Sequence, residues 1–187
     1  MQFNEGQTGI RLFPDEAREQ LAKKRYIIYS LTGQSIKTLK ITGRQFDTTW
    51  HQAYPDFEAR QSRLGEVAIN PEQLFLAGSN NKTLSEQLRL VALLSQHLSR
   101  KVPGVEATIA GAPDYVELAF AHLDETGNRL FGKDYNYNYA RTVTPFDSGF
   151  ACVGHLDADN RLNVAWHPEN GSSRVWVAPL LIPAIQK

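Results

Sequence analysis

The sequence contains a single cysteine, Cys152, so a disulfide bond within the chain is excluded. A chain without disulfides suits a reducing compartment. Its first residues, MQFNEGQTGIRLF, also lack the basic stretch and following apolar run that a secretory signal requires. We therefore expect a cytoplasmic protein without a secretory signal.

Long apolar runs and an excess of charge are missing as well. The longest apolar stretch, LVALLSQHL at residues 90–98, is much shorter than the roughly 18 residues that a membrane-spanning helix needs. The 20 basic and 20 acidic side chains cancel, so no overall field attracts nucleic acid or an anionic membrane. Neither a membrane nor a nucleic acid is expected as a partner.

What remains is the composition of an ordinary globular protein. Hydrophobic residues make up 42% of the chain and charged residues 21%, which is typical of such proteins. A length of 187 residues falls in the range of one domain. Since no Pro-, Gly- or Ser-rich linker divides the chain, we predict a single globular domain over residues 1–187.

Two helices are predicted from their end signals and apolar spacing. Residues 14–24 begin with a proline and two acidic residues and end with two lysines, as the helix dipole favours. Residues 83–101 begin with a capping box, Thr83 and Glu86, and carry a broad stripe of leucines. We expect this longer helix to pack centrally against a sheet.

The rest of the chain is predicted to form strands. Residues 25–31 and 35–42 suggest a hairpin through the turn between them. From Val105 onward, seven apolar or aromatic segments alternate with turn residues: 105–110, 115–123, 129–132, 135–143, 149–156, 161–166 and 174–182. Short connections favour an antiparallel meander. The predicted fold is therefore α+β, a meander sheet with a strand-rich C-terminal half against helix 83–101 and the shorter helix 14–24.

One short pattern occurs twice, as HLDETGNRL at residues 122–130 and HLDADNRL at residues 155–162. If two such hairpins lay side by side, four side chains could form a composite acid–base site. They are His122, Asp124, His155 and Asp157. Two ligands from one hairpin do not make a metal site, so no metal is expected.

The simpler interpretation, which we favour, is that both copies are turns. In the second copy, a loop of residues 158–160 would pair Asp157 with Arg161 and leave Asn160 in the left-handed region. This register places Leu156 opposite Leu162, as a half-buried sheet requires.

Alternating tyrosines in DYNYNYAR are the most unusual local pattern. Tyr135, Tyr137 and Tyr139 would share one face of a strand, and such a face can stack on the rings of a ligand. The favoured alternative is that these rings cover a sheet edge or pack under the long helix.

Two further features carry weaker predictions. Lys82 and Thr83 end a sequence similar to a phosphate-binding loop, but Leu76 and Asn81 occupy its two glycine positions, so only weak anion binding at the helix start is expected. Cys152 lies among small and apolar residues and is expected to be buried and inert.

Residues 44–70 show no clear period. Trp50, His51 and Tyr54 in this segment are candidates to line a pocket. The segment could form a lid over that pocket or simply wrap the sheet.

No catalytic motif occurs in the sequence, so a non-enzyme is favoured: a binding or protein-interaction domain for a protein or small-molecule ligand, able to form homo-oligomers and without a cofactor. The alternative is a small hydrolase that uses the composite His–Asp site of the two repeated segments.

Overall fold

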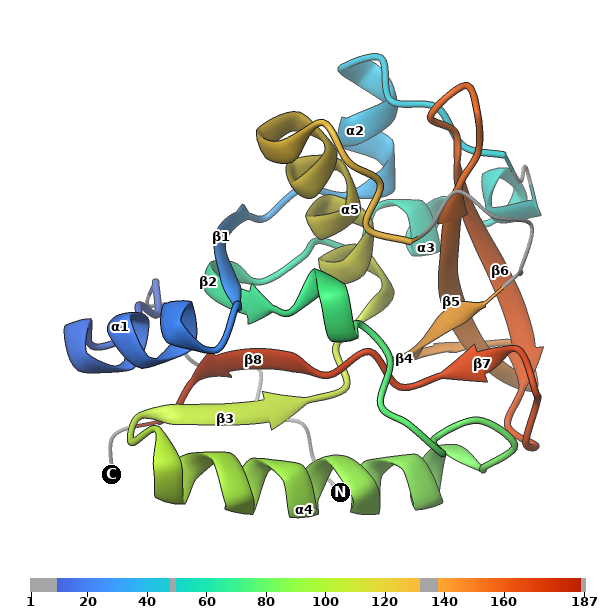
Figure 1. Ribbon diagram of the computed structural model, residues 1–187. Helices are drawn as coiled ribbons and strands as arrows, with labels where there is room; N and C mark the ends of the chain where they lie inside the picture. The colour runs from blue at the N-terminus through green and yellow to red at the C-terminus, as the bar shows by residue number, and fades with distance from the viewer. Residues whose placement is uncertain (1–9, 48–49, 132–137, 186–187) are drawn as a thin grey trace.

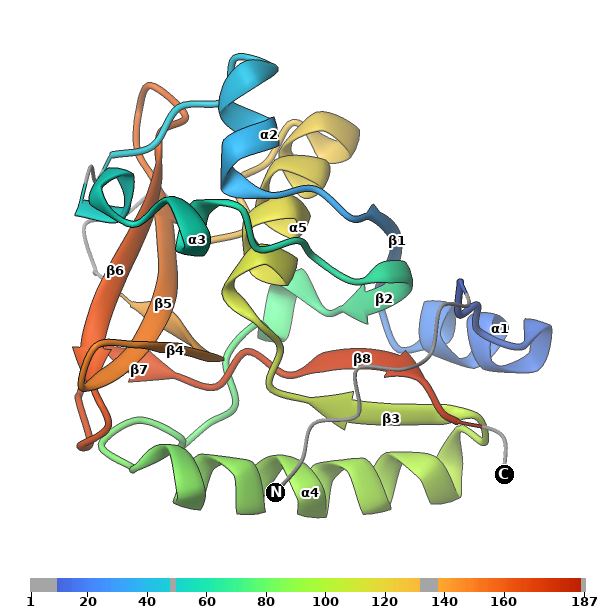
Figure 2. The ribbon, with the colours of Figure 1, turned by 180° about the vertical axis from the view of Figure 1, so that it is seen from behind.

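The computed structural model describes residues 10–47, 50–131 and 138–185 of the protein. These residues form five α-helices and eight β-strands, arranged in two four-stranded sheets (Figures 1 and 2). The helices are α1 (Asp15–Lys23), α2 (Ile36–Ile41), α3 (Pro55–Glu58), α4 (Leu84–Lys101) and α5 (Ala112–Thr126). The strands are β1 (Ile27–Thr32), β2 (Leu64–Ile69), β3 (Val105–Thr108), β4 (Tyr139–Phe146), β5 (Gly149–Leu156), β6 (Leu162–Pro168), β7 (Val175–Trp176) and β8 (Leu180–Pro183). The α+β class is confirmed.

The first sheet has the strand order β1-β2-β8-β3, and all its pairs are antiparallel. Helix α4 runs along β3 in both views (Figures 1 and 2). The Ser95 hydroxyl of α4 accepts a hydrogen bond of 2.9 Å from the Ala107 amide of β3. An exposed strand edge can pair with other chains, so α4 protects this one. Helices α1 and α4 both lie where the sequence predicts helices.

The second sheet has the order β6-β5-β4-β7. Strands β4, β5 and β6 follow one another in an antiparallel meander, as predicted, and β7 adds to β4 in parallel. The prediction of one continuous meander is wrong, because the C-terminal half supplies strands to both sheets. The chain passes from β7 in the second sheet directly to β8 in the first.

Helix α5, and not α4, is the central helix. The sequence predicts a strand over residues 115–123, and that prediction is wrong. Nearly every residue of the first two-thirds of α5 is buried, so it has no polar face whose period would identify a helix. By contrast, α4 lies at the edge of the first sheet, and it therefore leaves Leu88 and Leu93 exposed.

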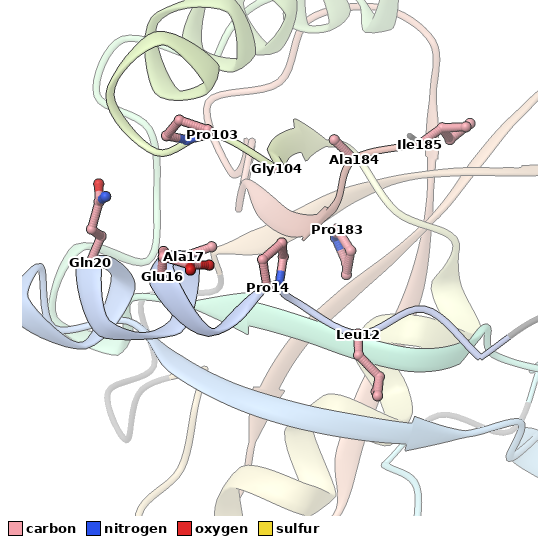
Figure 3. A pocket seen from close by; sticks show the side chains of 10 residues that line it. All are labelled: Leu12, Pro14, Glu16, Ala17, Gln20, Pro103, Gly104, Pro183, Ala184 and Ile185. Carbon is pink, nitrogen blue, oxygen red and sulfur yellow. The ribbon is translucent and has the colours of Figure 1, made fainter. Parts of the chain in front are cut away.

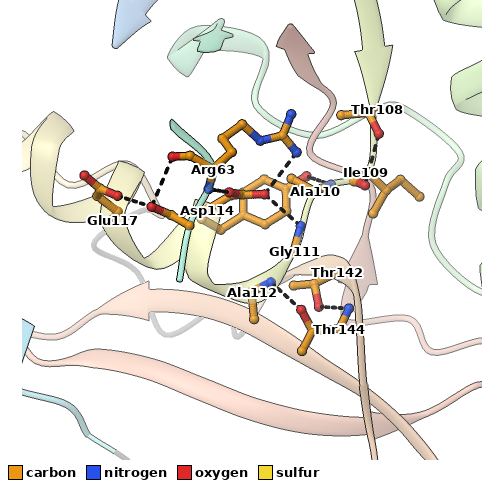
Figure 4. Close-up of polar contacts among 12 residues, drawn as sticks. Arg63, Thr108, Ile109, Ala110, Gly111, Ala112, Asp114, Glu117, Thr142 and Thr144 are labelled. Atoms are coloured by element: carbon orange, nitrogen blue, oxygen red, sulfur yellow. Dashed lines mark hydrogen bonds and ion pairs between the residues drawn. The ribbon is translucent and has the colours of Figure 1, made fainter. Parts of the chain in front are cut away.

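Two buried carboxylates fasten α5 to the chain around it (Figure 4). Asp114 accepts hydrogen bonds from the Arg63 amide at 2.7 Å and from the Arg63 guanidinium and the Gly111 amide at 3.0 Å. Glu117 accepts from the Thr32 amide and hydroxyl at 2.8 and 2.7 Å. Its other oxygen accepts from Ser62 Oγ and from one further backbone amide. Buried carboxylates need such donors to compensate for lost hydration, and here all of them except the Gly111 amide come from segments distant in sequence.

In the segment of residues 44–70, the described residues 44–47 and Trp50 lie along the edge of the second sheet, and the segment later enters the first sheet as β2. The Leu162 amide of β6 donates to the Gln45 carbonyl at 3.0 Å, and the Asp47 amide donates to the Leu162 carbonyl at 3.0 Å. The Trp50 indole donates to the Val164 carbonyl at 2.5 Å. These contacts occupy the outer edge of β6.

The predicted hairpin over residues 25–42 is half correct. Its first part is β1, but its second part is α2, which begins with a capping box formed by Ser35 and Thr38. The partner of β1 is instead β2. At Gly65 of β2, where φ is +121°, an added Cβ would lie 2.6 Å from the Arg11 carbonyl oxygen, so only glycine fits there.

Within the described residues, no helix has the length and apolar character needed to cross a membrane.

Candidate functional site

The first copy of the repeated sequence is the end of α5 and not a hairpin. His122 is only 4% exposed, and its Nδ1 shares a hydrogen bond of 2.5 Å with the Tyr29 hydroxyl. Burial lowers the pKa of His122. Asp124 is exposed and forms an ion pair with Arg44. The prediction of a turn at residues 122–130 is therefore wrong.

The second copy is the predicted hairpin. The Asp157 amide donates to the Arg161 carbonyl at 3.0 Å, Leu156 lies opposite Leu162, and Asn160 has φ +60°. The Asp157 carboxylate accepts from the Arg161 amide and guanidinium at 2.9 and 2.7 Å. Burial raises the pKa of Asp157, but these hydrogen bonds outweigh that effect and hold the pKa below its ordinary value.

The two copies do lie near each other, through Arg129. Its guanidinium donates to the Asn160 side chain at 3.0 Å and to the Ala158 carbonyl at 2.9 Å. The side chains of the proposed composite site have separate partners instead: Tyr29 for His122, Arg44 for Asp124 and Arg161 for Asp157. Half-buried His155 lies on β5. In the described residues, no group of three or more His, Cys, Asp or Glu side chains could hold a metal ion.

The predicted tyrosine face lies only in part within the described residues, since Tyr135 and Tyr137 fall outside them. Tyr139 is 8% exposed. Its ring covers Gly154, where an added Cβ would lie 2.5 Å from the ring, and it lies 5.2 Å from the His167 ring. Tyr139 thus packs on the second sheet.

The predicted anion-binding residues stand at the start of α4. The Thr83 hydroxyl accepts from the Glu86 amide at 3.3 Å, and the Glu86 carboxylate accepts from the Thr83 amide at 2.8 Å. The predicted capping box is confirmed, and it occupies donors that an anion would need. Lys82 precedes this cap and is half-buried.

Cys152 is buried in β5, as predicted. Burial raises the pKa of its thiol to about 12. The thiolate is the nucleophilic form, so this cysteine is inert at neutral pH.

A groove of about 580 Å³ lies near both ends of the described chain (Figure 3). Its lining is Leu12, Pro14, Glu16, Ala17, Gln20, Pro103, Gly104, Pro183, Ala184 and Ile185. Only Glu16 and Gln20 among these have polar side chains. Orientation and specificity in a binding pocket come from a few convergent polar groups, and this groove offers very few.

A second hollow, of about 350 Å³, lies between α3 and the turn that joins β4 to β5. We call it the aromatic hollow. Its lining is Ala53, Tyr54, Pro55, Asp56, Phe57, Arg60, Pro145, Phe146 and Asp147. It combines exposed ring surface with charged side chains, and it is the candidate functional site.

The rings of the aromatic hollow belong to one packed cluster. Tyr54 meets Phe146 edge-on at 4.6 Å between ring centroids, and Trp50 lies 4.3 Å from Phe146 and 5.2 Å from Phe57. Tyr54 is nevertheless 49% exposed. Packed rings lose little conformational freedom when a ligand binds, which favours them as anchors.

The charged side chains of the aromatic hollow are Asp56, Arg60 and Asp147, and all three residues are exposed. No ion pair joins any of them to another described residue. Two carboxylates against one guanidinium leave the hollow with a net negative charge. Asp147 has φ +50°, an uncommon conformation that fixes where this turn projects its side chain.

A polar cluster holds α3, and with it one wall of the hollow. Glu58 of α3 accepts from Lys40 Nζ at 2.5 Å and bonds the buried His51 at Nδ1 over 2.6 Å. Burial raises the pKa of Glu58, but the hydrogen bonds from Lys40 and His51 bring it below its ordinary value. Glu58 therefore stays ionised and anchors the helix.

Sequence reasoning selected Trp50, His51 and Tyr54 as candidates to line a pocket, and Tyr54 does so. It missed Phe146 and Asp147, whose only local signal is the turn in PFDSG. Comparison of this chain with protein families, with curated proteins and with solved structures found no match.

Proposed function

We propose that this protein is an interaction domain that binds a lysine or arginine side chain of a partner protein in the aromatic hollow. The observation that carries this proposal is the pairing of two rings, the exposed Tyr54 and the half-buried Phe146, with the unpaired carboxylates of Asp56 and Asp147. A cytoplasmic location, which the single cysteine favours, is part of the same proposal.

The chemistry of the hollow suits a cation. A cation above the face of an aromatic ring gains about 0.5–1 kcal/mol at an exposed site and more where water is excluded. Carboxylates beside the ring add charge-assisted hydrogen bonds to the same group. The aliphatic stem of lysine or arginine can lie along apolar surface while its charged head stays near water.

The size and charge of the hollow narrow the choice of ligand. A volume of about 350 Å³ is at the small end of ligand pockets, which favours one side chain over a large cofactor. Arg60 also lines the hollow, but an anionic ligand would face two carboxylates for this one guanidinium. A cationic ligand is therefore favoured.

The proposal can be tested with single amino acids as probes. The acetylated amides of arginine and of its neutral isostere citrulline are titrated into ¹⁵N-labelled protein while amide shifts are followed by NMR. We expect the arginine probe alone to shift amides near residues 54–60 and 146–147, with a Kd on the order of 1 mM.

Variants then test the residues of the hollow. Tyr54→Ala and Asp147→Asn are expected to weaken binding of the arginine probe at least about fivefold, or about 1 kcal/mol. Leu93→Ala, at a residue 63% exposed on α4, is the control and should bind like the wild type. Equal shifts with arginine and citrulline, or no shifts near the hollow, would contradict the proposal.

A further inference from the structure

Arg141 is a buried cation in the second sheet. It lies on β4 opposite Cys152, and it is 0% exposed. Its Nε donates to the Gln87 side chain at 3.0 Å, and one terminal nitrogen makes a long bond of 3.4 Å to the Pro168 carbonyl. The other terminal nitrogen, Nη2, is buried without a hydrogen-bond partner in the described residues.

The charge of Arg141 is also not neutralised. Among the described residues, no carboxylate lies within ion-pair distance of it, and the acids that act on it electrostatically are the Cys152 thiol and, less strongly, the exposed Glu169. Burial lowers the pKa of Arg141, yet a guanidinium keeps its proton in proteins. A buried charge without a partner is strongly unfavourable, so this arrangement invites an anion.

Other groups that suit an anion surround the same place. Tyr139, two residues before Arg141 on β4, has its ring 5.2 Å from the His167 ring, and its amide donates to the Arg174 carbonyl at 2.8 Å. Burial lowers the pKa of His167, and the positive charges of Arg141 and Arg174 lower it further. Gln87 donates to the Ser79 and Val175 carbonyls at 2.8 and 3.3 Å. These bonds fix its amide so that its oxygen faces the Arg141 guanidinium.

The loop of residues 168–174, whose Pro168 carbonyl contacts Arg141, is a surface segment with mostly exposed residues. It is joined to the chain just before α4, where the Asn81 amide donates to the Ser172 carbonyl at 2.9 Å. In both views β7 lies next to the N-terminal end of α4 (Figures 1 and 2). Lys82 and Thr83, for which the sequence predicts anion binding, therefore lie close to this loop, but the sequence did not indicate the buried cation, Arg141.

We propose that Arg141, with His167 and Arg174, forms a binding site for a phosphate group. A guanidinium presents paired N–H donors that match phosphate oxygens, and an anion would take up the unused Nη2 donors and neutralise the charge. The long bond to the Pro168 carbonyl is the contact that the anion replaces as it enters under the loop. This site is separate from the aromatic hollow and independent of the function proposed for it.

Thermal unfolding tests the site with inorganic phosphate as the probe. Unfolding is followed in phosphate and in chloride at equal ionic strength, so that general salt effects cancel. At about ten times Kd, phosphate should raise the Tm of the wild type by about 3–5 °C relative to chloride. Failure of phosphate to raise the Tm above that in chloride overturns the proposal.

The Arg141→Gln variant tests whether Arg141 binds the phosphate or only stabilises the fold. It should abolish the phosphate shift, while the Tm in chloride stays the same or rises because an unpaired buried charge is gone. Arg100→Gln, at an exposed arginine in the last turn of α4, is the matched control and should keep the full shift. An unchanged shift in Arg141→Gln overturns the proposal.

If Arg141→Gln does not fold, the exposed Arg174 decides the question. Arg174→Gln should weaken phosphate binding about tenfold, and equal affinity overturns the proposal. O-phosphoserine serves as a second probe: tighter binding than inorganic phosphate assigns the site to a phosphomonoester, and weaker binding assigns it to the free anion.

Discussion

The indole N–H of Trp50 donates to the Val164 carbonyl on the outer edge of β6, over 2.5 Å. The same ring lies 4.3 Å from Phe146, in the wall of the aromatic hollow. One side chain therefore protects a sheet edge and supports the proposed binding site. Protection of the edge and shape of the hollow are coupled through it.

Replacing Trp50 by phenylalanine should damage both features. Loss of the hydrogen bond to Val164 is expected to lower the free energy of unfolding by about 1–2 kcal/mol, with a further loss from the smaller ring. Urea unfolding measures this change, and NMR titration should show weaker binding of the arginine probe. Unchanged stability would mean that the edge of β6 does not depend on the indole.

Glu117 is expected to be essential for stability. In Glu117→Gln, an amide N–H₂ replaces one carboxylate oxygen and must face the donors of Thr32 or of Gln34 and Ser62. We expect a loss of about 2–4 kcal/mol, measured by urea unfolding. Glu125→Gln, at an exposed residue of the same helix, should change stability by less than about 0.5 kcal/mol. Similar losses in both variants would argue against a special role for Glu117.

The stability of the protein should fall as the pH drops through about 6.5, the ordinary pKa of histidine. Burial lowers the pKa of His122 in the folded protein, so over this range the unfolded chain binds more protons. The free energy of unfolding must therefore decrease with decreasing pH. His122→Gln should reduce this slope without removing it, because burial also lowers the pKa of His167. Urea unfolding between pH 8 and 5 measures how steeply the free energy of unfolding changes with pH in the wild type and in His122→Gln. Equal slopes in the two proteins would show that His122 does not contribute to this pH dependence.

Alanine substitutions at two glycines distinguish the destabilising effect of a positive φ angle from that of a close backbone contact. Both Gly43 and Gly65 have positive φ, but an added Cβ meets no atom within 4 Å at Gly43, whereas at Gly65 it meets the Arg11 backbone. Gly43→Ala should cost about 1 kcal/mol. Gly65→Ala should cost about 2–4 kcal/mol, since the segment at Arg11 must move. Thermal unfolding measures both losses of stability. Equal losses in Gly43→Ala and Gly65→Ala would show that the segment at Arg11 moves aside at little cost.

Features set by neighbouring residues were predictable from the sequence. The capping box of Thr83 and Glu86 and the hairpin loop that ends at Asn160 each depend on a few consecutive residues. Their hydrogen bonds form within one turn, so the pattern alone indicates them. The inert state of Cys152 followed from its small and apolar neighbours.

Features set by distant contacts were not predictable. The first two-thirds of helix α5 are buried on all sides, so this part of the sequence lacks the polar face that identifies a helix. The aromatic hollow joins Tyr54 to Phe146, which are far apart in the chain. Neither residue indicates the other without the fold that brings them together. The unpartnered Arg141 looks in the sequence like any arginine in a strand.

The position of β8 in the first sheet has a consequence for synthesis on the ribosome. This strand lies between β2 and β3, where Leu181 is opposite both Ala68 and Ala107. At translation rates of 5–20 residues per second, β2 emerges on the order of ten seconds before β8. Until β8 emerges, strands β2 and β3 of the nascent chain lack the neighbour that joins them, so the first sheet can close only late in synthesis.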